Sequence, residues 1–282
     1  MRKIPALLLP LLLLATACQR EESGTVKAAD GTAIRYQSRG QGDPALVFIH
    51  CWSCNRHYWD GQVKEFEKER RVVTLDLGGH GDSGKERQEW TVQSFVQDVQ
   101  AVLNHLKIKQ AILVGHSMGG PIALLVAAAQ PETVKAVICV DTLQNAEADP
   151  PRAQMKMAAD QMEVDLRKVN QAFLPTFFYK DSDPKLVAWV VDQASRADPK
   201  IAAALMRDLA DFDLKSALSA AKVPVRCINS AERIGPVFTD QAVNKKYADF
   251  EAILMSAVGH FPQLEQPARF NGFFRQILEQ LD

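Results

Sequence analysis

The segment Gly115-His116-Ser117-Met118-Gly119-Gly120 contains the residues best suited to chemistry. It follows the apolar run 110–114, and Pro121 opens a helix-like run directly after it. At a strand-to-helix turn, a G-x-S-x-G pattern exposes the serine hydroxyl above the sheet, and its glycines let the strand and helix approach closely. The start of the helix also presents N–H groups to a developing oxyanion. The pattern therefore predicts that Ser117 is a catalytic nucleophile.

A serine hydroxyl is a poor nucleophile by itself, so a neighbouring base has to activate it. Histidine is the usual base, and the chain contains six: His50, His57, His80, His105, His116 and His260. Only His260 follows the last strand-like run of the chain, in the segment Val258-Gly259-His260-Phe261-Pro262. We predict that His260 is the general base.

Seven strand-like runs alternate with helical stretches, a pattern typical of parallel strands joined by crossover helices. Several runs are almost continuously apolar, which indicates that helices cover both faces of the sheet. Residues 92–106 show helical spacing of apolar residues, which indicates packing. We predict an α/β fold with a mostly parallel central sheet and flanking helices. The strand-like runs are 33–38, 45–50, 71–76, 110–115, 134–141, 223–229 and 250–256.

The strand signal stops between Leu143 and about Leu218, where the sequence is rich in Ala, Met, Gln and charged residues. A loop-forming Asp-Pro-Pro segment lies near its start. We predict that residues 143–218 form a helical cap on a core built from residues 31–142 and 219–282. The large apolar side chains of the cap either line a pocket or pack its helices together. These are Met155, Met157, Met162, Phe173, Phe177, Phe178 and Trp189.

The composition is that of an ordinary folded protein, with 282 residues, 47% of them hydrophobic and 24% charged. The 33 basic and 34 acidic residues nearly balance, which argues against nucleic acid or an acidic membrane surface as partner. The histidines are scattered and no metal-binding spacing occurs, so we expect no metal and no cofactor. A small-molecule substrate is the expected partner, and the oligomeric state stays open.

The N-terminal residues indicate export. Two basic residues precede the apolar run 4–17, which is shorter than the roughly 20 residues needed to span a bilayer. The tail Leu14-Ala15-Thr16-Ala17-Cys18 resembles a bacterial lipoprotein box, which implies lipidation of Cys18. We expect residues 1–17 to be a cleaved signal peptide and residues 18–30 to be a linker. The mature protein would face the periplasm or the cell exterior, attached to a membrane through its lipid alone.

From Ala33 to Leu281 the chain resembles the α/β-hydrolase family. Besides the nucleophile turn, His50-Cys51-Trp52 resembles the family's His-Gly-x oxyanion loop, and residues 76–83 resemble its D-x-x-G-x-G-x-S turn. In this family, backbone N–H groups of the loop and of the residue after the nucleophile bind the oxyanion. The resemblance therefore implies that Trp52 and Met118 supply the two donors.

The resemblance also implies a carboxylate that orients the base, and two residues are candidates. The pair Gly259-His260 matches the family's G-H loop, and the order serine before histidine is the one this fold uses. Asn229 and Glu232 lie where the family commonly has Gly and Asp three residues apart. Asp141 instead ends an earlier strand-like run, the position that some relatives use. Spacing favours Glu232, with Asp141 as the alternative; either carboxylate would fix the imidazole tautomer.

Cys51 departs from the family pattern, because glycine is usual at this position. A side chain there costs energy if the backbone needs a positive φ. Cys51 and Cys54 form a C-x-x-C, which in an exported protein could be a disulfide or a redox pair. A link between them could pin the oxyanion loop, or the substitution could have weakened catalysis.

The leading interpretation is a serine hydrolase that cleaves a small carboxylic ester through an acyl-enzyme. Related proteins run cofactor-free perhydrolase (haloperoxidase-like) and C–C bond hydrolase reactions on the same triad, so these alternatives stay open. A third alternative is a relative that binds a ligand without turnover, since a fold alone does not fix function. Cys51 favours this last alternative, whereas the intact Ser117 and His260 oppose it.

Overall fold

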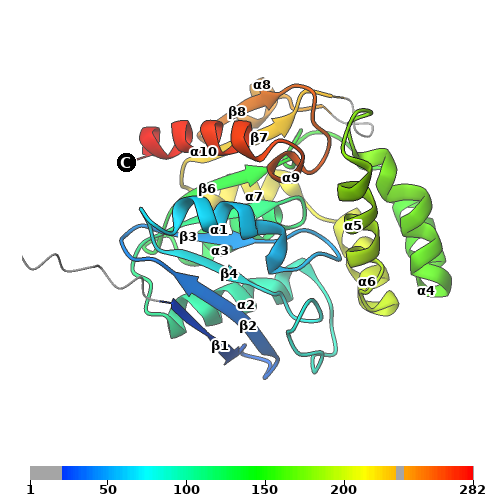
Figure 1. The fold of residues 1–282 in the computed structure, drawn as a ribbon, viewed down its shortest axis with the longest axis horizontal. Helices are drawn as coiled ribbons and strands as arrows, with labels where there is room; N and C mark the ends of the chain where they lie inside the picture. Colours follow the sequence, from blue (N-terminus) through cyan, green and yellow to red (C-terminus); the bar gives the residue numbers. More distant parts are fainter. Residues whose placement is uncertain (1–20, 233–237, 282) are drawn as a thin grey trace, which may run out of the picture.

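The computed structural model describes residues 21–232 and 238–281 (Figure 1). The expected signal peptide, residues 1–17, and the expected lipidation site, Cys18, lie outside these ranges. A central sheet, helices on both of its faces and a group of helices at one end make up the fold. None of the described helices is both long enough and apolar enough to span a bilayer.

The central sheet has eight strands in the order β1-β2-β4-β3-β5-β6-β7-β8. The β1–β2 and β2–β4 pairs are antiparallel, whereas every neighbouring pair from β4 to β8 is parallel. This is the α/β-hydrolase fold, so the predicted fold class is confirmed, and all seven predicted strands are present. The strands are β1 Glu21–Lys27, β2 Ala33–Arg39, β3 Ala45–Ile49, β4 Val72–Leu75, β5 Ala111–His116, β6 Val134–Val140, β7 Val225–Ser230 and β8 Phe250–Met255.

Strand β1 was not among the predicted strands, because residues 18–30 read as a linker. It pairs with β2 along its whole length, from Glu21 opposite Arg39 to Lys27 opposite Ala33. Its residues alternate between exposed and half-buried, and Val26 is its one large apolar side chain. Backbone hydrogen bonds to β2 therefore hold an edge strand that carries almost no hydrophobic signal, and the linker prediction does not describe residues 21–27.

Successive side chains of a strand point to opposite faces of the sheet, and both faces are covered by helices. In β3, Val47 packs in the layer formed with α2, α3 and α7, whereas Phe48 packs in the layer formed with α1 and α10. This explains why the central strands are apolar at every position. The helices outside the cap are η1 Arg56–Trp59, α1 Asp60–Phe66, α2 Val92–His105, α3 Gly119–Ala129, α7 Leu214–Ala221, α8 Gln241–Asn244, α9 Pro262–Glu265 and α10 Pro267–Leu281.

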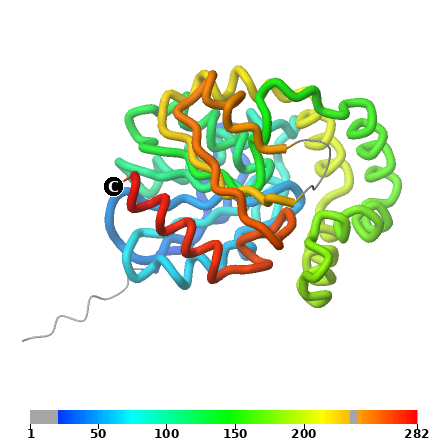
Figure 2. The backbone as a smooth tube through the Cα atoms, turned by 90° about the horizontal axis from the view of Figure 1, so that it is seen from above, coloured from blue at the N-terminus to red at the C-terminus, as the bar shows by residue number. Residues whose placement is uncertain are grey.

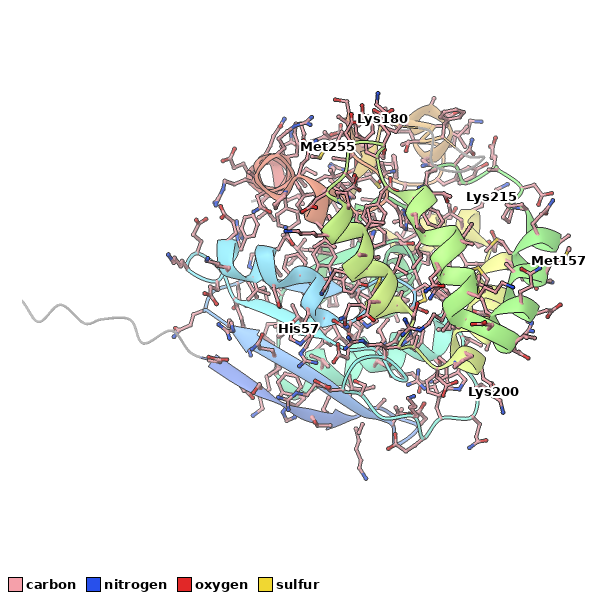
Figure 3. All side chains as sticks on the ribbon, turned by 45° about the vertical axis from the view of Figure 1, so that its right-hand side comes forward. His57, Met157, Lys180, Lys200, Lys215 and Met255 are labelled. Atoms are coloured by element: carbon pink, nitrogen blue, oxygen red, sulfur yellow. A yellow bond between two sulfur atoms is a disulfide. The ribbon has the colours of Figure 1, made fainter. Side chains whose placement is uncertain are left out.

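Helices α4, α5 and α6 lie together at one end of the molecule, in the region predicted to be a cap (Figures 1 and 2). Buried Met162 packs between α4 and α6, whereas Met157 is 63% exposed on the outer side of α4 (Figure 3). Helix α7 starts within the predicted cap range but packs against α3 of the core. The cap helices are α4 Arg152–Phe173, η2 Leu174–Phe177, α5 Pro184–Ala194 and α6 Pro199–Ala210.

Candidate active site

Ser117 occupies a tight turn between β5 and α3. Its φ is 52°, in the left-handed region that non-glycine residues rarely adopt. The glycines around it are required by space: a Cβ on Gly115 would lie 2.2 Å from the carbonyl oxygen of Gly119, and one on Gly119 would lie 2.5 Å from that of Ile49. The turn therefore holds the Ser117 side chain, which is half-buried, at the end of the sheet.

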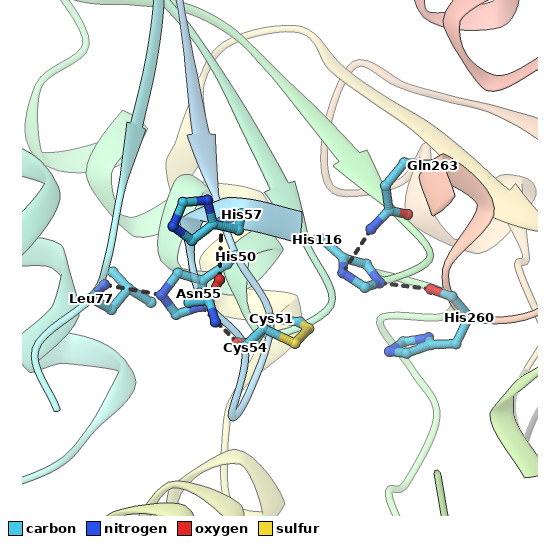
Figure 4. The surroundings of a disulfide bond; sticks show 9 residues. All are labelled: His50, Cys51, Cys54, Asn55, His57, Leu77, His116, His260 and Gln263. Carbon is cyan, nitrogen blue, oxygen red and sulfur yellow. Dashed lines mark hydrogen bonds between the residues drawn. A yellow bond between two sulfur atoms is a disulfide. The ribbon is translucent and has the colours of Figure 1, made fainter. Parts of the chain in front are cut away.

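His116, directly before Ser117, ties this turn to the loop that carries His260. Its Nε2 lies 2.6 Å from the carbonyl oxygen of His260, and the amide of Gln263 donates to its Nδ1 (Figure 4). Because Nδ1 accepts, Nε2 carries the proton and donates to His260. Burial lowers the pKa of His116 well below its ordinary value, so the ring stays neutral. The nucleophile turn and the main chain of His260 are thus fixed to each other.

Asp141 holds the other side of His260. The Nδ1 of His260 lies 2.6 Å from Oδ2 of Asp141, which directly follows β6. The second oxygen, Oδ1, accepts a hydrogen bond from the backbone N–H of Ser230 at 2.8 Å. Asp141 is 5% exposed, so its carboxylate is held in one orientation away from bulk water. With Nδ1 directed at Asp141, Nε2 of His260 is the nitrogen left for proton transfer.

Glu232, which spacing favours as the acid, binds elsewhere. Its Oε1 accepts from the N–H of Ala257 at 3.0 Å, and its own N–H donates to Oγ of Ser230. Asn229, its partner in the spacing argument, is buried and donates to the carbonyl of Thr142. The structure therefore brings Asp141 to His260, while Glu232 braces the loop before it.

The oxyanion loop follows β3, and His50 fixes its first peptide. The N–H of Leu77 donates to Nε2 of His50, so Nδ1 carries the proton and donates to the carbonyl oxygen of Cys51 at 2.8 Å (Figure 4). Burial lowers the pKa of His50 to about 4, which keeps the ring neutral. In a trans peptide the carbonyl and the following N–H point in opposite directions. Fixing the Cys51 carbonyl therefore also aims the N–H of Trp52.

Cys51 and Cys54 form a disulfide that closes this loop (Figure 4). The N–H of Cys54 also donates to the carbonyl of Cys51 at 3.2 Å. The positive φ of the loop, 54°, belongs to Ser53, so Cys51 does not bear the backbone cost expected where glycine is usual. The indole N–H of Trp52 donates to the carbonyl of Ala202 on α6. The disulfide therefore holds the oxyanion loop closed, and the Trp52 hydrogen bond connects this loop to the cap.

The predicted D-x-x-G-x-G-x-S turn supports the oxyanion loop. The carboxylate of Asp76 accepts from the N–H of Arg56 at 2.7 Å and from that of Asp82 at 2.9 Å. A Cβ on Gly81 would lie 2.3 Å from the Asp76 carboxyl carbon, so glycine is required there. Buried His80 donates from Nδ1 to the carbonyl of Gly78. Within the described ranges, no three His, Cys, Asp or Glu side chains gather as a metal site would require.

Sequence reasoning missed one residue that shapes this site. His116 occupies a variable position of the G-x-S-x-G pattern, so the pattern assigns it no role. Its hydrogen bond to the His260 carbonyl depends on a loop 144 residues further along the chain. The only available signal was its position beside the nucleophile.

The family can be assigned from a comparison with known sequences. Residues 44–194, more than half of the chain, match the family model described as alpha/beta hydrolase fold. The chain therefore belongs to this family, and it is a hydrolase.

Individual relatives agree along nearly the whole chain. It is 26% identical over 258 residues to 3-oxoadipate enol-lactonase 2 of Acinetobacter baylyi, covering 90% of this chain and 96% of that protein. It is 26% identical over 249 residues to a pimeloyl-[acyl-carrier protein] methyl ester esterase of Yersinia pseudotuberculosis, covering 85% and 93%. The solved structure of an esterase from Exiguobacterium antarcticum superposes with a TM-score of 0.83 at 20% identity, covering 92% and 100%, and shows the shared fold.

Proposed function

We propose that the protein hydrolyses small-molecule carboxylic esters through an acyl-enzyme formed on Ser117. The observation that carries this proposal is the placement of His260, held at Nδ1 by Asp141 and at its carbonyl by His116, the neighbour of Ser117. The names of two relatives, an enol-lactonase and a methyl ester esterase, support an ester or lactone bond as the target.

In the proposed mechanism, Nε2 of His260 takes the hydroxyl proton as Oγ of Ser117 attacks the ester carbonyl. The N–H groups of Trp52 and Met118 bind the oxyanion, and Asp141 stabilises the imidazolium. The imidazolium then gives its proton to the departing alcohol, which leaves the acyl group on Ser117. Water, deprotonated by His260, attacks this acyl-enzyme; the bond from the acyl carbon to Oγ of Ser117 breaks, Oγ takes the proton back from His260, and the carboxylic acid leaves.

The surroundings of His260 favour substrates with an apolar part. The ring of Phe177 lies 5.2 Å from the ring of His260, and that of Phe173 lies 4.7 Å from Phe177. The half-buried Trp52 of the oxyanion loop packs against the cap helices α4 and α6. We propose that these aromatic residues of the cap and the oxyanion loop contact the acyl or alcohol part of the ester.

Labelling with a fluorophosphonate probe tests this proposal. We expect a single covalent adduct on Ser117 in the wild-type chain and none in Ser117→Ala, because only an activated serine attacks the phosphorus. Hydrolysis of p-nitrophenyl esters of increasing acyl length would then define the acyl preference. If the folded wild-type protein gives neither the adduct nor hydrolysis, the proposed ester hydrolysis is wrong, and a ligand-binding role is the remaining alternative.

The disulfide of the oxyanion loop is expected to support the reaction. In the double variant Cys51→Ser/Cys54→Ser we expect kcat to fall by about tenfold, less than the 10²–10³ that a lost oxyanion donor costs, because His50 still orients the peptide. KM should change little. The measurement is steady-state kinetics on one p-nitrophenyl ester. A double variant with wild-type kcat would show that the hydrogen bonds alone hold the loop.

A further inference from the structure

The carboxylate of Glu265 collects hydrogen bonds from both sides of His260. The N–H of Gly259 lies 2.9 Å from each of its oxygens, and the N–H of Phe261 lies 3.1 Å from Oε1. The same carboxylate accepts from the N–H of Tyr179 at 3.1 Å and from Oγ of Ser182 at 2.5 Å. One side chain at the end of α9 therefore joins the residues flanking the base to the segment of the cap between η2 and α5.

Besides its contacts with His116, Asp141 and Glu232, the loop around His260 is held by the cap. Strand β8 ends at Met255 and α9 begins at Pro262, so His260 lies in neither. Its own N–H donates to the carbonyl of Phe177, again in the cap, at 2.7 Å. A Cβ on Gly259 would lie 2.1 Å from that same carbonyl, so the loop and the cap are in direct backbone contact. The three consecutive N–H groups of residues 259–261 thus all donate to Glu265 or to the cap.

Among the described residues, Glu265 forms no ion pair, so hydrogen-bond donors rather than a cation satisfy its carboxylate. An ionised carboxylate accepts from several donors at once, and bonds to a charged acceptor are stronger than neutral ones. A neutral amide of the same shape would place N–H groups against some of the same donors. Both side-chain oxygens of residue 265 must therefore accept hydrogen bonds. This requirement indicates that the carboxylate holds the loop and the cap segment together and is not simply a solvated surface charge.

We propose that Glu265 is a positioning residue that makes the placement of His260 depend on the cap. With the cap in place, Tyr179 and Ser182 complete the shell of Glu265, and Phe177 accepts from the N–H of His260. Displacing the cap segment breaks these bonds and loosens the loop that carries the base. The inference rests on the proposed ester hydrolysis, because it assigns His260 the role of base.

The test compares Glu265→Gln with the wild type. We expect kcat to fall by about 10- to 100-fold with KM within about threefold, because a small misplacement of the base affects the transition state more than binding. The strong hydrogen bond between His260 and Asp141 should give a low-field proton NMR signal in the wild type, and we expect this signal to broaden or vanish in the variant. A purely structural role would lower the melting temperature and leave both readouts unchanged.

Two further variants keep the test decisive. Ser182→Ala removes only the cap hydroxyl, so we expect a kcat loss of several-fold that Ser182→Thr restores. Gln266→Leu is the matched control, because the Gln266 amide donates to the carbonyl of Ala257 in the same loop and accepts from Arg269, whereas the bonds of Glu265 go to the N–H groups of Gly259 and Phe261. We expect this variant to keep the wild-type kcat and NMR signal.

The outcomes separate the two proposals. If the wild type hydrolyses esters and labels on Ser117 while Glu265→Gln keeps kcat within twofold, the positioning role is wrong and the enzyme stands. If Glu265→Gln does not fold, an unchanged kcat in Ser182→Ala overturns the coupling to the cap. If the wild type neither labels nor turns over, the proposed function itself has failed.

Discussion

Replacing Asp141 by asparagine is expected to lower kcat by about 10⁴-fold, the cost typical of a triad whose orienting acid is neutralised. Both carboxylate oxygens of Asp141 accept hydrogen bonds, one from His260 and one from the N–H of Ser230. An amide in this position must turn its NH₂ group toward one of these two donors. If the NH₂ group faces His260, it favours the wrong tautomer of the imidazole. If it faces the N–H of Ser230, the bond that fixes the orientation of the residue 141 side chain is lost.

Asparagine is the informative substitution because of the backbone. The φ of Asp141 is 43°, in the left-handed region, which asparagine tolerates better than alanine does. The loss in kcat should therefore come without unfolding, as circular dichroism and thermal melting would show. KM should change less than kcat.

Glu232→Gln is the matched control. The side chain of Glu232 accepts a hydrogen bond from the N–H of Ala257 and does not bind the imidazole of His260, so we expect a change in kcat of no more than a few-fold. If Glu232→Gln abolished turnover while Asp141→Asn retained it, the acid would be the residue that spacing favours. The loop that carries His260 would then have to rearrange before catalysis, so that the imidazole reaches Glu232.

The fold and the strand-to-helix turn around Ser117 could be predicted from the sequence because both rest on local signals. Apolar runs of strand length predicted β2 to β8, and the glycines of the turn around Ser117 are needed by contacts within that turn and with β3. Strand β1 was not predicted, because backbone pairing with β2 holds it and its sequence has no periodic apolar pattern.

The choice between two acids could not be made from spacing. Strands β6 and β7 are parallel neighbours, so the residues that follow them emerge side by side at the same edge of the sheet. Which of Asp141 and Glu232 reaches the imidazole then depends on side-chain direction and on the path of the loop before His260. Both are set by tertiary contacts. His116 contacts a residue 144 positions further along the chain, and Glu265 contacts Tyr179 of the cap.

A second large effect is expected in acid. Burial lowers the pKa of His50 to about 4 and that of His80 to about 3, and it lowers the pKa of His116 well below its ordinary value. In the unfolded chain these histidines titrate near 6.5. Between about pH 6.5 and pH 4 the unfolded state therefore binds more protons, so the free energy of unfolding falls as the pH falls.

Asp98 works in the opposite direction. Burial raises its pKa to about 6 despite its ion pair with Arg87, so the folded state binds a proton that the unfolded state releases. Near pH 5 each of the three histidines takes up close to one proton on unfolding, and Asp98 releases close to one. The net uptake is about two protons, or about 2.7 kcal/mol of lost stability per pH unit, which is large against a total of 5–15 kcal/mol.

Urea denaturation at a series of pH values measures this uptake directly. We expect the unfolding free energy to drop steeply between pH 6 and pH 4.5. In His80→Gln, we expect the slope of unfolding free energy against pH near pH 5 to correspond to an uptake of about one proton instead of about two. Glutamine can still donate to the carbonyl of Gly78 but does not titrate, so the change in slope isolates a single group. A free energy independent of pH in this range would mean that these histidines gain protons without unfolding. A protonated His50 could not accept a hydrogen bond from the N–H of Leu77, so the account of how His50 orients the peptide between Cys51 and Trp52 would fail as well.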